Sequence, residues 1–211
     1  MIEVRAYTIY HSPNAYIGSV LARRRLATLP HVRLVRRPFF VPRERGLLVA
    51  DLVGGKETAA MGSYHREDVA RWAKRYGIPL AYPPPGTLAR WAKTWTWHRE
   101  ELPARAYYAA CGTGREDALD RALFEAAWID GMDVNLPETV RWAADKAGLD
   151  SDRLLADAEG DGPGREVRAA LAEFDRLQCP GVPTFVLAGE RFFGKDRVDW
   201  LVAAIGERST V

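Results

Sequence analysis

A serine and a proline, Ser12 and Pro13, stand where a run rich in β-branched and aromatic residues gives way to a helical pattern. Ser12 suits the N-cap of that helix, and Pro13 suits its first position. The N–H groups of a first helical turn lack partners within the helix and carry partial positive charge. A hydroxyl there can donate a hydrogen bond to a thiolate, whose pKa falls at a helix N-terminus. The sequence therefore offers a thiol-activating site, with a plain N-cap as the alternative.

Ser12 has no evident base that would make it a nucleophile. A serine nucleophile needs an oriented histidine and a carboxylate. His11 is adjacent, but we expect both residues on a strand, where neighbouring side chains point to opposite faces. The two cysteines, Cys111 and Cys179, match no metal or redox spacing, and there is no Cys-x-x-Cys. We expect them to be free and buried, with a disulfide between them as the alternative, so any thiol at Ser12 would have to come from a bound molecule.

Two further candidate segments lie near the end of the chain. Gly181-Val182-Pro183-Thr184 leads into an apolar run, and a proline within a sheet is confined to an edge strand, a bulge or the first residue of a strand. Gly194-Lys195-Asp196-Arg197 precedes the last helical pattern. Asp196 suits the cap of that helix, and it could also pair with a ligand ammonium group. The N–H groups that follow could hold a carboxylate.

The elements that must position these residues come from both ends of the chain. Strands are predicted at 3–10, 32–40, 185–187 and 191–193. Helices are predicted at 13–28, 66–76, 88–97, 105–111, 118–130, 137–147, 151–158, 163–177 and 196–205, with a loop at 52–58. The β-α-β start and the β-β-α end are each incomplete. We therefore predict one α/β domain, residues 1–63 plus 178–211, interrupted by a helical domain, residues 64–177.

The composition is that of an ordinary globular protein, with 47% apolar and 27% charged residues and a net charge of +2. Eight arginines lie between Arg23 and Arg45 against one acid, Glu44. No nucleic-acid-binding motif accompanies them, so we expect a solvated surface and no nucleic-acid partner. No signal peptide is visible, and no apolar run reaches the roughly 18 residues that span a bilayer. We expect a cytoplasmic protein without a membrane partner.

Together these motifs resemble the 2-hydroxychromene-2-carboxylate isomerases and kappa-class glutathione transferases, in the DsbA-like branch of the thioredoxin superfamily. Four stretches, in the family's order, carry the resemblance: Ser12-Pro13-x-x-Tyr16, residues 68–80 (DVARWAKRYGIPL), Gly181-Val182-Pro183-Thr184 and Gly194-Lys195-Asp196-Arg197. They span nearly the whole chain. The resemblance implies a thioredoxin-like α/β domain with an inserted all-helical domain and a site in the cleft between them.

The resemblance also implies that the bound thiol is glutathione. In the family a serine bonds the sulfur, the residue before a cis-proline pairs its backbone with the cysteinyl unit, and a Gly-x-Asp-Arg turn receives the γ-glutamyl end. The matching positions are Ser12, Val182, Pro183, Gly194, Lys195, Asp196 and Arg197.

Two positions depart from the family pattern. Gly55 stands near a usual asparagine, and Met61 stands where relatives carry a lysine. Lys56 is a candidate to replace the lost charge. An aromatic substrate would meet side chains from His11 and from the helical segment. The candidates for substrate binding are His11, Lys56, Trp91 and Trp95.

The function that the resemblance implies is a glutathione-dependent isomerisation of an aromatic hydroxy-acid or pyruvate-type compound. The alternatives are a kappa-type glutathione transferase, whose product is the adduct, and a non-catalytic thioredoxin-like binding module. The partner is a small aromatic substrate, and a homodimer stays open.

Overall fold

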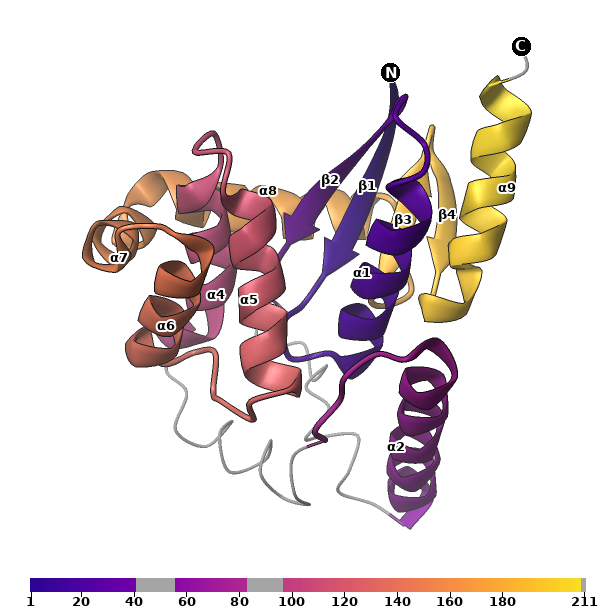
Figure 1. The fold of residues 1–211 in the computed structure, drawn as a ribbon, viewed down its shortest axis with the longest axis horizontal. Helices are drawn as coiled ribbons and strands as arrows, with labels where there is room; N and C mark the ends of the chain where they lie inside the picture. The colour runs from indigo at the N-terminus through magenta and orange to yellow at the C-terminus, as the bar shows by residue number, and fades with distance from the viewer. Residues whose placement is uncertain (41–55, 83–96, 210–211) are drawn as a thin grey trace. The chain divides into compact units, whose positions relative to one another are not determined.

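The computed structural model describes residues 1–40, 56–82 and 97–209 (Figure 1). The strands are β1 (Ile2–Thr8), β2 (Val32–Pro38), β3 (Thr184–Leu187) and β4 (Glu190–Phe193). The helices are α1 (Pro13–Leu26), α2 (Lys56–Tyr76), α4 (Trp97–Ala110), α5 (Glu116–Trp128), α6 (Pro137–Ala147), α7 (Ser151–Glu159), α8 (Asp161–Arg176), the short 3-10 helix η2 (Lys195–Arg197) and α9 (Val198–Ser209).

The chain divides into two compact units. We call residues 1–39 with 168–211 the sheet unit, and residues 40–167 the helical unit. Helix α8 begins in the helical unit and ends in the sheet unit. The domain boundaries predicted from the sequence, at 63/64 and 177/178, stay a prediction.

The sheet unit is built on four strands in the order β2-β1-β3-β4. Strands β1 and β2 are parallel, whereas β3 is antiparallel to both β1 and β4. A parallel pair needs a crossover, and α1 supplies it. The predicted β-α-β start and β-β-α end thus join in one mixed sheet, with helices between them in the sequence.

The two faces of this sheet are covered differently. Helix α1 contacts β2 and α9, and α9 contacts β3 and β4 (Figure 1). On the opposite face, the ring of Tyr7 lies 5.9 Å from that of Phe174 in α8, and Phe39 lies 4.7 Å from Phe174. Burial raises the pKa of Tyr7 well above its usual value. Side chains alternate along β1, so Val4 and Ala6, both buried, point to the side opposite Tyr7.

A charged cluster holds the end of α8 on the sheet. Glu173, whose side chain is only 16% exposed, accepts from Arg5 Nη1 at 2.5 Å. Arg37 Nε lies 3.4 Å from the second carboxylate oxygen, and Arg176 Nη2 lies 3.7 Å from the first. One carboxylate therefore serves three guanidinium groups. Removing the carboxylate would leave positively charged guanidinium groups facing one another at a half-buried position.

A buried ion pair holds the helical unit together. Arg105 of α4 donates to Glu101 at 2.7 Å, and both side chains are less than a tenth exposed. The same guanidinium reaches the carbonyl oxygens of Ala158 and Gly160 at 3.4 and 3.3 Å. Both carbonyls lie at the C-terminal end of α7, where the carbonyl groups have no hydrogen-bond partner within the helix. A side chain at Gly164 would strike this guanidinium, within 2.6 Å of Nη2.

Several elements differ from the sequence predictions. Strand β2 ends at Pro38 rather than at residue 40, helix α2 begins at Lys56 rather than at residue 66, and helix α4 begins at Trp97 rather than at residue 105. Strand β1 ends at Thr8 rather than Tyr10, because residues 10 and 11 form a turn closed by the Ser12 N–H donating to Ile9 O at 3.1 Å. Helix α2 begins at Lys56, so the loop predicted at 52–58 is wrong for its last three residues. Lysine, glutamate and alanine are good helix formers, and they outweigh the glycines beside them. The helix predicted at 88–97 lies outside the described residues except for its last residue, which begins α4.

Most other helices lie close to their predicted bounds. Helix α6 has Pro137 at its first turn, as predicted, and ends at Ala147; its C-cap, Gly148, has a left-handed backbone with φ 74°. Helix α7 is capped by Asp150, which accepts from the Arg153 N–H at 3.0 Å. In the described ranges, none of the helices combines the length and the apolar character that a membrane crossing requires.

We predict that Glu173→Gln destabilises the protein, because Arg5 and Arg37 lose a shared anionic partner. The expected loss is about 1–3 kcal/mol in the free energy of unfolding. Glu67→Gln is the matched control, since Glu67 pairs with Arg71 at 2.8 Å on an exposed face of α2. Such exposed pairs contribute well under about 1 kcal/mol. Urea unfolding of both variants measures the difference, and equal small losses would contradict the cluster's role.

Candidate thiol-binding site

Ser12 is the N-cap of helix α1. Its backbone is extended, with φ −99° and ψ 116°, and its Oγ accepts from the Ala15 N–H at 3.2 Å. Its carbonyl accepts from the Tyr16 N–H at 3.0 Å. A serine hydroxyl has two lone pairs and one proton, so this cap bond leaves the proton free to be donated. The predicted cap is confirmed, and the donor role toward a thiolate stays a prediction.

His11 is half-buried in the turn that follows β1. The prediction that His11 and Ser12 lie on one strand, with side chains on opposite faces, is wrong because β1 ends at Thr8. Its predicted contact with a substrate stays a prediction.

The Gly181–Thr184 loop lies at the entry to β3. The Val182–Pro183 peptide bond is cis. The Thr184 hydroxyl donates to the Gly181 carbonyl at 2.6 Å, and the Gly194 N–H donates to the Pro183 carbonyl at 2.9 Å. The second bond ties this loop to the start of the Gly194–Arg197 turn. Two of the predicted binding segments are therefore joined directly.

Gly18 brings α1 against both segments, and sequence reasoning missed it. A β-carbon at this position would lie 2.6 Å from Pro183 Cγ and 3.6 Å from Lys195 Cα. Only a glycine permits so close an approach of helix to loop. The sequence offered one signal, an isolated glycine inside a predicted helix. Such a glycine can be required by close packing at a site.

The Gly194–Arg197 turn presents two charged side chains to solvent. Gly194 has φ 105°, a backbone that favours glycine, and η2 follows it. Lys195 is buried, whereas the side chains of Asp196 and Arg197 are each 45% exposed and lie 2.8 Å apart. Arg197 also lies over the ring of Trp200, 5.3 Å from its centroid. Asp196 and Arg197 are thus the open charged groups of this turn.

The structure brings some of the predicted residues together and leaves others undescribed. The sheet unit contains Ser12 and both later segments, and α1 packs against η2. Lys56 begins α2 in the helical unit, but its side chain lies outside the described part. Trp91 and Trp95 lie outside the described residues altogether.

The cysteines are free, as predicted, but they are not both buried. Cys111 is exposed, and Cys179 is half-buried four residues before Pro183. Burial raises the pKa of the Cys179 thiol, with the neighbouring Arg191 acting in the opposite direction. A raised pKa keeps this thiol protonated and weakly reactive at neutral pH. Cys179 is therefore a poor substitute for the missing redox cysteine.

We predict that Gly18→Ala weakens glutathione binding tenfold or more, because the new methyl group must push Pro183 away from α1. Overpacking of this kind costs about 1–3 kcal/mol of stability, partly offset by alanine's helix propensity. The matched control is Gly206→Ala in α9, where an added β-carbon meets nothing within 4 Å. Calorimetry measures binding, and thermal unfolding measures stability. Unchanged binding in Gly18→Ala would contradict the importance of this contact.

Comparison with known proteins agrees with this architecture. The family model described as a DSBA-like thioredoxin domain matches residues 3–206. The 2-hydroxychromene-2-carboxylate isomerase of Sphingobium xenophagum is 25% identical over 201 residues, which cover 92% of this chain and 93% of the relative. That of Pseudomonas putida is 27% identical over 147 residues, covering 68% and 64%.

Solved structures share the fold. A 2-hydroxychromene-2-carboxylate isomerase superposes with a TM-score of 0.76 at 22% identity, covering 99% of this chain and 96% of that one. The cytosolic disulfide reductase DsbM from Pseudomonas aeruginosa, solved with GSH, gives 0.66 at 14% identity and covers all of both chains. Since the family model spans almost the whole sequence, this chain belongs to the DsbA-like thioredoxin-domain family.

Proposed function

We propose that this protein is a glutathione-dependent isomerase of an aromatic hydroxy-acid or pyruvate-type compound. The observation that carries the proposal is Ser12, which caps α1 in place of a redox cysteine and keeps a proton to donate. The isomerase names of the curated relatives support the reaction class. A DsbA-like fold solved with GSH supports the choice of thiol.

The described residues fit glutathione as a ligand. A thiolate needs donors and positive potential, and Ser12 together with the first-turn N–H groups of α1 supplies both. The zwitterionic γ-glutamyl end needs an acceptor for its ammonium group and donors for its carboxylate. Asp196 can accept from the ammonium, and Arg197 and the N–H groups after it can donate to the carboxylate. Val182 would supply backbone groups to the cysteinyl unit.

Glutathione, when bound, would supply a thiolate that adds to a conjugated carbon of the substrate and later leaves it. While the sulfur is attached, the carbon–carbon double bond is a single bond and can rotate, with no net oxidation or reduction. Ser12 would hold the sulfur anionic before addition and again after departure. A donor aimed at charge that develops during reaction is worth on the order of 3 kcal/mol. The loss of a cap costs only about 1 kcal/mol of stability. The contribution of Ser12 to catalysis is therefore larger in free energy than its contribution to stability, and measuring both in one variant separates them.

A reducing compartment suits this proposal, because glutathione keeps cytosolic thiols reduced. Both cysteines of the chain are free. A cytoplasmic location therefore accompanies the proposed function.

The test is an assay with 2-hydroxychromene-2-carboxylate, with and without glutathione, followed by NMR. We expect the isomer to form only with glutathione, glutathione to be fully recovered, and Ser12→Ala to be at least tenfold slower with a small drop in Tm. A ligand at one hundred times Kd raises stability by about 2.7 kcal/mol, so thermal shift reports binding separately. An accumulating conjugate would instead indicate a transferase. An absent thermal shift would favour a non-catalytic module.

A further inference from the structure

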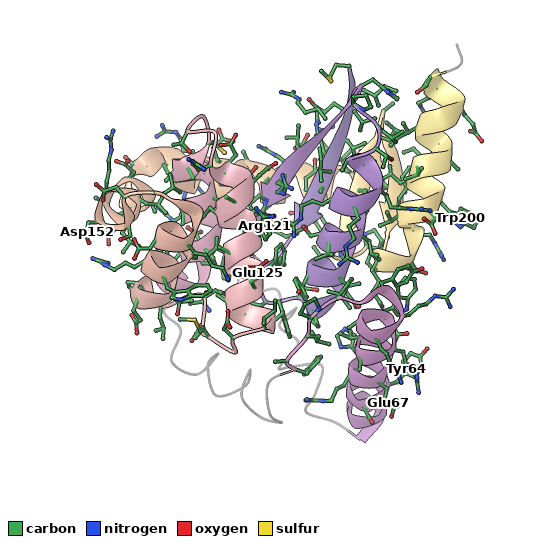
Figure 2. All side chains as sticks on the ribbon, in the orientation of Figure 1. Tyr64, Glu67, Arg121, Glu125, Asp152 and Trp200 are labelled. Atoms are coloured by element: carbon green, nitrogen blue, oxygen red, sulfur yellow. The ribbon has the colours of Figure 1, made fainter. Side chains whose placement is uncertain are left out.

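Trp200 is a large aromatic residue of α9 that stands open to solvent. It is 66% exposed and is labelled on α9 in Figure 2. A tryptophan contributes to stability mainly by burying its ring. The fold therefore gains little from this ring, and its place beside the Gly194–Arg197 turn calls for another explanation.

The first turn of α9 is fixed by the residues on either side of Trp200. Val198 and Leu201 are buried against the rest of the sheet unit, with 3% and 0% exposure. Asp199 accepts from Arg25 Nε of α1 at 2.9 Å. The backbone that carries Trp200 therefore has a defined place, although most of its ring stays outside the packing.

The guanidinium group of Arg197 lies over the ring of Trp200. Arg197 Cζ stands 5.3 Å from the ring centroid, across the junction of η2 and α9. A guanidinium group is planar and carries its N–H donors at its edge. A contact through its face leaves those donors to other partners, and one of the nitrogens, Nη1, donates to Asp196 at 2.8 Å.

This arrangement prepares Arg197 to bind an anion. A flexible arginine loses conformational entropy when a ligand orders it, and a side chain that is already held loses less. The indole ring is uncharged, and its polar atom is only a donor, so it does not compete with an anion for the N–H groups of Arg197. The ring thus holds the cation without occupying the donors that a ligand would use.

We propose that Trp200 is a positioning residue that holds Arg197 ready to donate to the α-carboxylate of a bound γ-glutamyl group. This inference rests on the proposed function, in which Arg197 receives that carboxylate. Trp200 acts through Arg197 and contributes nothing to the ammonium group, which Asp196 accepts. The effect of Trp200 is therefore selective for thiols that carry a carboxylate at this end.

Three thiol peptides separate the two charges of the γ-glutamyl group. They are glutathione, glutaryl-Cys-Gly, which lacks the ammonium group, and γ-aminobutyryl-Cys-Gly, which lacks the α-carboxylate. By calorimetry, Trp200→Ala is expected to lose about threefold or more in affinity for the two peptides that keep the carboxylate, the range of an exposed cation–π contact. The affinity for the aminobutyryl peptide is expected to stay unchanged. Trp200→Phe, which keeps an aromatic face, retains most of the wild-type affinity, whereas Trp200→Leu loses as much as Trp200→Ala.

The Arg197→Ala background tests whether Trp200 acts through Arg197. In that background Trp200→Ala is expected to cause no further loss of glutathione affinity, because two residues that share one interaction are not additive. The matched control is Trp142→Ala in the helical unit, which removes a ring 4.5 Å from Lys146 Nζ and is expected to leave all three affinities unchanged. Thermal unfolding of each variant measures stability separately.

Three results would overturn the role of Trp200 while leaving glutathione binding intact. They are equal losses for the three peptides in Trp200→Ala, a loss that persists in the Arg197→Ala background, and an unchanged affinity for glutathione. A wild-type protein that binds none of the three peptides would overturn the proposed function as well.

Discussion

Helix α1 can lie against the Val182–Pro183 loop because residue 18 has no side chain. A β-carbon there would come within 2.6 Å of the proline ring. Ser12 stands at the beginning of this helix, and the loop and the Gly194–Arg197 turn are joined by the bond from Gly194 N to Pro183 O. One glycine in the first third of the chain thus makes room for segments more than 160 residues further on. The geometry of the candidate site depends on that contact.

The proposed chemistry depends on which residue caps the N-terminus of helix α1. A cysteine there could exchange disulfides, because a lowered pKa makes it a thiolate. A serine hydroxyl cannot be oxidised in this way, but it can cap the helix and donate to another molecule's sulfur. Cys179, the cysteine of the sheet unit, has a raised pKa and does not replace it. We therefore propose that this fold, which a solved disulfide reductase shares, serves here to activate a bound thiol.

The order of elements and the chemical motifs could be predicted because they depend on local patterns. Ser12 was recognisable as an N-cap from its place before Pro13, and the two end segments of the chain were recognisable as halves of one sheet. The end of β1 could not be predicted, because a backbone bond from Ser12 to Ile9 turns the chain after Thr8. The start of α2 was missed because the glycines before it outweighed good helix formers in our prediction. The close contact of Gly18 with Pro183 joins distant segments of the chain, and no local sequence pattern contains such a contact.

The pKa of the glutathione thiol in the bound state tests the central claim most directly. Thiolate absorbance in the ultraviolet can be followed against pH at saturating glutathione, with wild-type protein and with Ser12→Ala. A free thiol titrates near pH 8.5. The account predicts a bound pKa at least one unit lower in the wild type and a return toward the free value in Ser12→Ala. A bound thiol that titrates at the same pH in both proteins would contradict it.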